Sequence, residues 1–381
     1  MLQIFVLSIH PAPYRDFVFQ RLYERKRIKI KVAHYYKLDL GHKEWLWTSP
    51  PYPHFCSKFG KTSGSLYQLH FDILLQTASS TYDVIVIPGY SRLTSLFSIL
   101  IARFRRKPVI LVLDTIAERK SRGLLASFKR VIKKCLLGLC QGYWVPGVAS
   151  ARYLSGIGVD ANIIAQGAYC LCPAKFKSQL EELKDSRKTL RMNLGIDQYS
   201  VVVLAVGKMM PFRRYDLLIR SWANLRQDTR KTLLLVGDGP LHSELMAFPE
   251  KRGICGVKFI GPCSSNELAR YYAIADAYVH PGAEPFSTAL ELAAIAGLPI
   301  LANNCVGYVY DLISRGAQPL IFQLDDTVDL TLKLETLTSV NYLKLAKSSL
   351  ISKEAAAQRT PEWAAQELEN LAYLTVNTKL K

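Results

Sequence analysis

The chain has 381 residues, of which 49% are hydrophobic and 21% are charged. That composition excludes a disordered chain and, at this length, predicts about two to three globular domains. Basic residues outnumber acidic residues by 49 to 31, a net charge of +18. Residues 1–180 contain 26 basic and 9 acidic side chains, whereas residues 181–381 contain 23 and 22. The two halves therefore differ in kind, because nearly all the excess charge lies in the first.

The apolar and cysteine patterns exclude further classes. No stretch of about 18 apolar residues occurs, so no helix is expected to span a bilayer. Residues Met1–His10 are apolar but lack a basic leader, and Pro11 follows at once, so we expect a first strand and not a signal peptide. The eight cysteines include no CxxC pair, which argues against a zinc site and favours reduced thiols in the cytoplasm.

Short apolar, β-branched segments alternate with helix-length segments along the whole chain. In the first half the predicted strands are Ile4–Ser8, Ile28–His34, Val84–Pro88, Val109–Asp114 and Gly142–Pro146. In the second half they are Val201–Gly207, Thr232–Gly237, Val257–Gly261, Ala277–His280, Pro299–Ala302 and Leu320–Phe322. This alternation predicts an α/β fold of two Rossmann-like, doubly wound parallel sheets with helices on both faces. Such sheets bind ligands at the carboxyl ends of their strands, so a central cleft between two domains is the expected site.

The strand pattern restarts near residue 200, after a polar stretch. We therefore predict an N-terminal domain over residues 1–180, a linker over 181–198 and a second domain over 199–358. Residues 359–381 are expected to form a C-terminal helix that could cross back to the first domain. Thr360 can cap that helix, and Pro361 suits its first position.

The predicted strand at 201–206 ends in Gly207, and two cations follow before an amphipathic helix. Lys208 and Arg213 would lie at the carboxyl end of a strand, beside a helix N-terminus, where a diphosphate can be neutralised. The alternative is that both are solvated surface cations, which is equally compatible with the residue types.

Two later strand ends carry further candidates. Gly237 and Gly239 flank an aspartate in a tight turn, for which a purely structural role is the stronger interpretation. Glu284 precedes a helix and could bind sugar hydroxyls, because a carboxylate accepts several hydrogen bonds at once. The exposed amides at the start of that helix could face an anion, and a glutamate two turns on could bind a ribose diol. The residues concerned are Phe286, Ser287, Thr288 and Glu291. The alternative is a capped helix with one exposed glutamate.

Taken together, these elements resemble a known family over residues 201–322. They are Gly207-Lys208, Pro211, Arg213, Asp216-Leu-Leu, Gly237-Asp-Gly-Pro240, Phe259-Ile-Gly261, Ala275-Asp276, Glu284-Pro-Phe and Ala296-Gly-Leu-Pro299. Their order and spacing resemble the donor domain of the retaining glycosyltransferases of family 4, the glycosyl transferases group 1, which have the GT-B fold.

The resemblance implies that Lys208 and Arg213 hold the diphosphate of a nucleotide-sugar. It implies that Glu284 contacts the donor sugar and that residues 286–288 line its pocket. It also implies retention of configuration, no essential metal and no cofactor, the nucleotide-sugar being a co-substrate. In the family a second glutamate lies eight residues after the first, whereas Glu291 lies seven after Glu284. One residue is about 100° around a helix. Either the helix register is adjusted, or Glu291 does not hold the ribose in the usual way.

The resemblance of the first half is looser. Residues 8–15, followed by a helix, resemble the family's first strand–helix loop, and another predicted strand ends near Asp114. By position alone, His10 and Asp114 are candidate catalytic residues. A histidine or aspartate at a strand end is as suited to orienting a loop as to chemistry.

The cations of the first half cluster at residues 21–31, 96–107 and 127–137. The last two clusters mix large apolar residues with basic ends, as interfacial helices do, and several such cations can hold a protein at an anionic membrane. The alternative is that the apolar faces are core and the cations a solvated rim. No helix-turn-helix, zinc-finger or RNA-recognition signature occurs, so we do not expect nucleic acid as the partner.

The sequence thus predicts a hexosyltransferase that uses a nucleotide-sugar on its C-terminal domain. The acceptor, a lipid-linked or polysaccharide-precursor molecule, would bind the basic N-terminal domain. The expected setting is polysaccharide assembly, with the protein cytoplasmic and peripheral on the inner membrane face. Two alternatives stay open: a non-catalytic basic protein on the same fold that binds membrane or nucleic acid, and a nucleotide-sugar epimerase.

Overall fold

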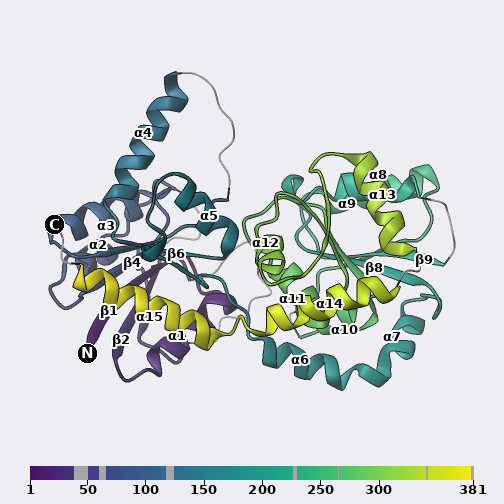
Figure 1. The fold of residues 1–381 in the computed structure, drawn as a ribbon, viewed down its shortest axis with the longest axis horizontal. Coiled ribbons are helices and arrows are strands. Elements are labelled where there is room, and N and C mark those ends of the chain that lie inside the picture. Colours follow the sequence, from purple (N-terminus) through teal and green to yellow (C-terminus); the bar gives the residue numbers. More distant parts are fainter. Residues whose placement is uncertain are drawn as a thin grey trace. The chain divides into compact units, whose positions relative to one another are not determined.

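A computed structural model describes residues 1–37, 50–59, 66–116, 124–225, 230–264, 266–339 and 342–378. The chain divides into two compact units (Figure 1). Unit 1 contains Met1–Leu171 together with Arg359–Lys381, and unit 2 contains Cys172–Gln358. None of the helices within the described residues combines the length and the apolar character needed to cross a membrane.

Unit 1 is a seven-stranded parallel sheet with the strand order β3-β2-β1-β4-β5-β6-β7. Its strands are β1 (Leu2–Ser8), β2 (Ile28–His34), β3 (His54–Cys56), β4 (Val84–Pro88), β5 (Val109–Val112), β6 (Gly142–Val145) and β7 (Ile164–Gln166). Its helices are α1 (Pro13–Tyr23), α2 (Phe71–Ala78), α3 (Leu93–Phe104), α4 (Leu124–Gly138), α5 (Val148–Gly156), the short η1 (Ala161–Ile163) and α15 (Pro361–Asn377). The edge strands β3 and β7 were not predicted, because three residues are too few to show a pattern.

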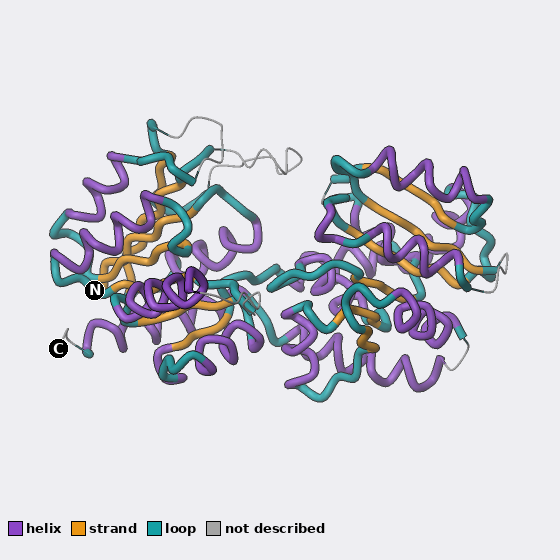
Figure 2. Tube along the Cα trace, turned by 90° about the horizontal axis from the view of Figure 1, so that it is seen from above, coloured by secondary structure: helices purple, strands orange, loops and turns teal. Residues whose placement is uncertain are grey.

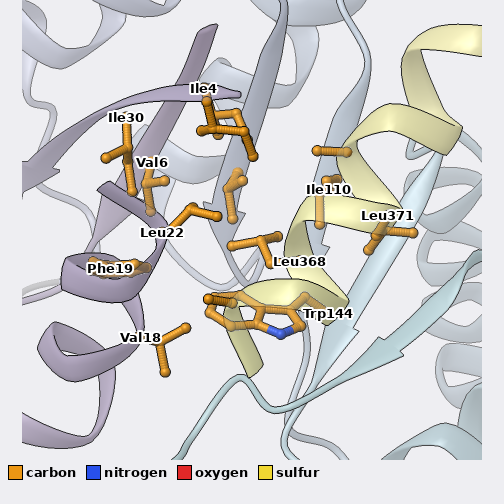
Figure 3. Close-up of a cluster of buried hydrophobic side chains, with 14 of the residues drawn as sticks. Ile4, Val6, Val18, Phe19, Leu22, Ile30, Ile110, Trp144, Leu368 and Leu371 are labelled. Carbon is orange, nitrogen blue, oxygen red and sulfur yellow. The ribbon is translucent and has the colours of Figure 1, made fainter. Parts of the chain in front are cut away.

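Both faces of this sheet are buried, as helices on either side require. Along β1, Ile4 and Val6 face one apolar cluster, whereas Phe5 and Leu7 face the other. Figure 3 shows the first cluster, in which side chains of α1 and α15 meet those of the sheet. The layers of helix and strand are also visible in Figure 2.

The C-terminal helix α15 packs directly on strands of unit 1. A Cβ at Gly142 would approach side-chain atoms of Leu371 and Thr375 to 3.0 and 2.9 Å, so only glycine admits the helix this closely. Thr360 caps the helix, since its hydroxyl accepts a hydrogen bond from the backbone N–H of Trp363 at 3.2 Å. The predicted start of the helix is therefore confirmed.

Unit 2 is a six-stranded parallel sheet with the order β10-β9-β8-β11-β12-β13. Its strands are β8 (Val201–Val206), β9 (Lys231–Val236), β10 (Val257–Gly261), β11 (Ala277–His280), β12 (Ile300–Asn303) and β13 (Leu320–Phe322). Its helices are α6 (Pro173–Glu182), η2 (Lys184–Ser186), α7 (Arg187–Asn193), η3 (Pro211–Arg213), α8 (Tyr215–Ala223), α9 (His242–Arg252), α10 (Leu268–Ile274), α11 (Thr288–Ala296), α12 (Gly307–Ser314), α13 (Thr327–Thr338) and α14 (Tyr342–Ala357). The predicted class, two Rossmann-like parallel-sheet domains, is confirmed.

The predicted linker at 181–198 differs from the structure, which places these residues in unit 2, with helices up to Asn193. The chain passes from one unit to the other at Leu171 and Cys172, earlier than the expected boundary at residue 180. Two arginines of this stretch are anchored to unit 2. Arg187 and Arg191 contact the carboxylate of Asp276 at 2.6 and 2.7 Å. These ion pairs make the stretch part of unit 2. The number of charged residues in the sequence does not reveal such pairs.

Candidate functional site

The strand order of unit 2 creates a switch point at the carboxyl ends of β8 and β11. From β8 the chain builds outward to β9 and β10 on one side, and from β11 to β12 and β13 on the other. Ligands of doubly wound sheets bind at such a point. The two loops that leave it contain residues 207–214 and 281–287.

These two loops are held together at very close range. A Cβ on Gly282 would lie 2.5 Å from the Cα of Arg213, so the backbones can approach only at a glycine. The N–H of Ala283 donates a hydrogen bond to the carbonyl of Phe212 at 3.3 Å. Arg213, at the end of η3, is thereby placed against Glu284.

An ion-pair cluster lies at this junction. The guanidinium of Arg213 donates to Oε1 of Glu284, and the same oxygen is 2.8 Å from Nε2 of His280. The side chains of Arg213, Glu284 and His280 are 20%, 11% and 2% exposed, so the cluster is largely shielded from water. We call these three residues the Arg–Glu–His cluster.

The protonation of Glu284 reflects two opposing effects. Burial by itself raises the pKa of this carboxyl, because it disfavours the charged form. The charges of His280 and Arg213 outweigh that effect and hold the pKa below its ordinary value. The site therefore presents an ionised carboxylate in a nearly water-free position. Such a group can accept hydrogen bonds from hydroxyls while the cations beside it attract an anion.

The backbone fixes Glu284 as well. It forms an isolated parallel bridge with Val306, and its carbonyl accepts a hydrogen bond from the N–H of Gly307 at 3.0 Å. Lys208 lies half-buried in the loop that follows Gly207, on the β8 side of the switch point. The structure thus brings Arg213 and Glu284 into contact, and places Lys208 in the loop that leads to them.

The predicted glycines serve the packing of two neighbouring loops. A Cβ on Gly237 would lie 2.2 Å from the carbonyl oxygen of Gly207, and one on Gly239 would lie 2.7 Å from the amide nitrogen of Met209. The N–H of Met209 donates to the carbonyl of Asp238 at 2.8 Å. This close approach explains the glycines at 237 and 239 by structure alone, and their contact with a donor stays a prediction.

The side chains at the start of α11 are also used by the fold. Ser287 caps the helix, because its hydroxyl accepts a hydrogen bond from the N–H of Leu290 at 3.2 Å. Phe286 is 8% exposed and packs edge-to-face on Tyr308. Residues 286–288 can offer an anion their backbone amides at a helix N-terminus. Thr288 is the first residue of that helix.

Glu291 lies inside α11 with 0% of its surface exposed. The alternative of a capped helix with one exposed glutamate therefore does not apply to Glu291. A ribose contact would require the side chain to become accessible, so this role stays a prediction.

The two candidates from the first half, His10 and Asp114, lie in unit 1. Nδ1 of His10 is 2.9 Å from the carbonyl of Pro11, and the His10 carbonyl accepts from the guanidinium of Arg15 at 3.0 Å. Asp114 is exposed and accepts a hydrogen bond from the hydroxyl of Tyr169 at 3.1 Å. These contacts orient loops at the carboxyl edge of the sheet, and catalytic roles for both residues stay predictions.

Sequence reasoning missed His280. The residue stands at the end of a correctly predicted strand, four residues before Glu284. A strand-end position at the sheet's carboxyl edge was the available signal. Its burial and its contact with the carboxylate could not be seen without the structure.

Two doubly wound sheets, the second with a charged cluster at its switch point, define the class of protein with the GT-B fold. Solved structures share this fold over nearly the whole chain. Anabaena HepE, in complex with UDP and glucose, is 17% identical, with a TM-score of 0.70 over 97% of this chain and 99% of that one. A glycosyltransferase from Rickettsia africae is 11% identical, with a TM-score of 0.73 over 99% of both chains.

A family match covers most of unit 2. Residues 200–339 match the model of the glycosyl transferases group 1, which confirms the resemblance stated above. The chain is also 32% identical over 138 residues to a D-inositol 3-phosphate glycosyltransferase of Mycobacterium sp. strain KMS. A second relative of that description, from Rhodococcus jostii, is 30% identical over 163 residues. These matches span 30% and 36% of the relatives' own lengths and 32% and 40% of this chain.

Proposed function

We propose that the protein is a glycosyltransferase that moves a hexose from a nucleotide-sugar to a lipid-linked or polysaccharide-precursor acceptor, with retention of configuration. The observation that carries the proposal is the Arg–Glu–His cluster at the switch point of unit 2. It lies inside the region that matches the glycosyl transferases group 1.

In this proposal the donor diphosphate lies against the loop 207–213. Lys208 and Arg213 neutralise the charge that grows on the leaving diphosphate as the glycosidic bond breaks. The effect is strong because Arg213 is mostly buried, and an ion pair in a low-dielectric site is weakly screened. The amides of residues 286–288 add fixed positive ends of dipoles.

Glu284 positions the sugar in the same proposal. Its carboxylate, kept ionised by His280 and Arg213, accepts hydrogen bonds from the sugar hydroxyls and thereby orients the anomeric carbon. The donor class is supported by Anabaena HepE, whose structures hold UDP and UDP-glucose. A phosphate-bearing acceptor is supported by the names of the curated relatives and by the positive charge of the first half.

The setting belongs to the same proposal. The +17 balance of residues 1–180 supports contact with an anionic membrane at its cytoplasmic face, where a lipid-linked acceptor would be met. Part of that charge is used inside the protein, since Arg21 and Arg25 pair with Glu362 and Glu369 of α15. The cations that end α3 and begin the next loop are exposed and remain for a partner.

The test is to incubate the full chain with UDP-, GDP- and ADP-sugars and to measure nucleoside diphosphate release and donor binding. We expect release with at least one donor, and its loss in Lys208→Ala combined with Arg213→Ala. Lys251→Ala, an exposed cation of α9, is the matched control and should change nothing. Absence of binding and release with every donor would refute the proposal. Binding without turnover, in the presence of acceptor lipids, would favour the non-catalytic alternative.

A further inference from the structure

Helix α3 of unit 1 buries its hydroxyl side chains together with Ile99 and Ala102, and it exposes a stripe of large apolar side chains. Its hydroxyl side chains Thr94, Ser95 and Ser98 are 0% exposed. On the opposite side, Phe97, Leu100 and Phe104 are 43%, 51% and 87% exposed. These three lie at helical spacing, so they form one apolar stripe. A soluble helix normally buries such a stripe and exposes its hydroxyls.

Hydrogen bonds hold α3 in this orientation. Thr94 donates its hydroxyl to the carbonyl of Gln68 at 3.0 Å and accepts from the N–H of His70 at 3.1 Å. The hydroxyl of Ser95 is 2.9 Å from that of Tyr35. Because these bonds hold the polar face inward, rotating the helix to hide its stripe would break them.

Helix α2 extends the apolar surface. It packs beside α3 (Figure 1) and exposes Phe71 and Leu75, which are 55% and 73% exposed. Phe59 is 47% exposed and packs edge-to-face on Phe71. We call the exposed side chains of α2, α3 and Phe59 the α2–α3 face. Clusters of exposed large apolar residues on a soluble domain mark a site that meets a partner or a membrane.

The charge next to this face is mainly positive. Arg103, Arg105 and Arg106 are exposed at the end of α3, and no described residue forms an ion pair with them. The sequence of α3 contains no acidic residue. On α2 the one acidic side chain, Asp72, keeps its negative charge but is turned to the protein, since it accepts from the hydroxyl of Ser57 at 2.7 Å and the N–H of Lys58 at 2.9 Å.

We propose that the α2–α3 face is the surface by which this protein docks on an anionic lipid bilayer, with Phe97, Leu100 and Phe104 inserted at the level of the headgroups. The flanking arginines would contact lipid phosphates, as basic residues beside an interfacial helix do. At about 1.5 Å per residue, α3 is roughly 18 Å long, which suits a helix that lies on the membrane and not one that crosses it. This proposal assigns the membrane contact to a particular surface of unit 1. It rests on the proposed function in one respect, because a lipid-linked acceptor is the reason for the protein to bind a membrane.

The bilayer is favoured over a protein partner by the combination of features. Phenylalanine and leucine side chains can insert among lipids without needing specific hydrogen-bond partners. The adjacent guanidinium groups can bind the phosphates of the lipid headgroups. A second copy of this chain would instead place these arginines near one another, which like charges disfavour.

The experiment is co-sedimentation of the full chain with vesicles of phosphatidylcholine alone, or of phosphatidylcholine and phosphatidylglycerol in equal amounts. We expect clear preference for the anionic vesicles. The variant F97S/L100S/F104S should lose binding by about tenfold or more at every salt concentration, because the loss is of apolar insertion. The variant R103Q/R105Q/R106Q should lose binding several-fold at low salt and little at high salt, because salt screens the phosphate contacts. The matched control V328S/L332S removes two exposed apolar side chains from α13 and should bind as wild type.

Three results would overturn the proposal. They are wild-type binding by F97S/L100S/F104S, equal binding of the wild type to both vesicles, and a concentration-dependent dimer that the triple variant abolishes in place of vesicle binding. Release of nucleoside diphosphate, measured without vesicles, should be unchanged in the triple variant, so this test is separate from that of the transferase. If the triple variant proves unstable, F104S alone decides, since that side chain is 87% exposed: full vesicle binding by F104S would refute the inserted stripe.

Discussion

Unit 1 and unit 2 each contain a parallel sheet buried on both faces, yet they place their charged residues differently. In unit 2, arginines are drawn to carboxylates near the sheet, at Arg191 with Asp276 and at Arg213 with Glu284. In unit 1, Arg21 and Arg25 pair with α15, while the arginines that follow α3 face outward beside apolar side chains. A shared sheet plan thus supports a ligand site in one unit and a docking surface in the other, because both are decided at strand ends and helix faces.

The largest effect should come from breaking the anchor of unit 2. In Asp276→Ala, the guanidinium of Arg191, which is 5% exposed, is left without its carboxylate. Removing one partner of a buried ion pair costs about 3–5 kcal/mol of unfolding free energy. The guanidinium keeps its hydrogen bonds to the carbonyls of Ile274, Gln198 and Ser200, so we expect the lower end of that range. Urea unfolding should show unit 2 melting early while unit 1 is unaffected. The control is Asp185→Asn, which changes an exposed acidic residue in the segment that contains Arg191. Equal unfolding free energies of the two variants would contradict the anchoring.

The next effect concerns the charged cluster itself. Glu284→Gln keeps the size of the side chain and removes the negative charge, so we expect turnover to fall by roughly a hundredfold or more, as for the loss of one preorganised polar group. The measurement is nucleoside diphosphate release at saturating donor. Glu250→Gln on the exposed end of α9 should retain wild-type turnover. Undiminished turnover in Glu284→Gln would place the chemistry elsewhere.

A smaller effect is expected where α15 packs on the rest of unit 1. Gly167 has a φ of +99°, and a Cβ there would lie 2.8 Å from Cβ of Ala364. Gly167→Ala therefore combines backbone strain with overpacking, and we expect a loss of about 1–3 kcal/mol. The loss should appear in the unfolding of unit 1 and not of unit 2. Gly156→Ala, where nothing lies within 4 Å of the added Cβ, is the comparison.

The smallest expected effect is a change in the pH dependence of stability and of donor binding. Because the pKa of Glu284 in the folded protein lies below its ordinary value, its ionised form stabilises the fold above the unfolded pKa, and this stability is lost as the pH falls through the folded pKa. Replacing His280 by alanine removes a favourable charge and leaves burial, which raises the pKa. The acid limb of donor binding should therefore move to higher pH in His280→Ala. An acid limb at the wild-type position would show that His280 does not sustain the charge of Glu284.

Much of the architecture could be predicted from local patterns of apolar and turn residues. Eleven of the strands were predicted near their observed bounds, because each is a short apolar run bounded by turn residues. The edge strands β3 and β7 were missed, since three residues carry no period. The polar stretch at 181–198 was misread because its arginines find partners near residue 276, which no local rule can show.

The two parallel sheets, the start of α15 and the strand-end placement of Arg213 and Glu284 follow from local sequence, since periodicity and strand-end rules act over a few residues. That Arg213, Glu284 and His280 meet on one carboxylate oxygen follows from the tertiary structure alone. The tertiary structure also decided that α3 turns its hydroxyls inward and its phenylalanines outward. Both outcomes depend on packing between segments far apart in the chain, where a few ångströms of backbone approach decide which groups are paired, buried or exposed.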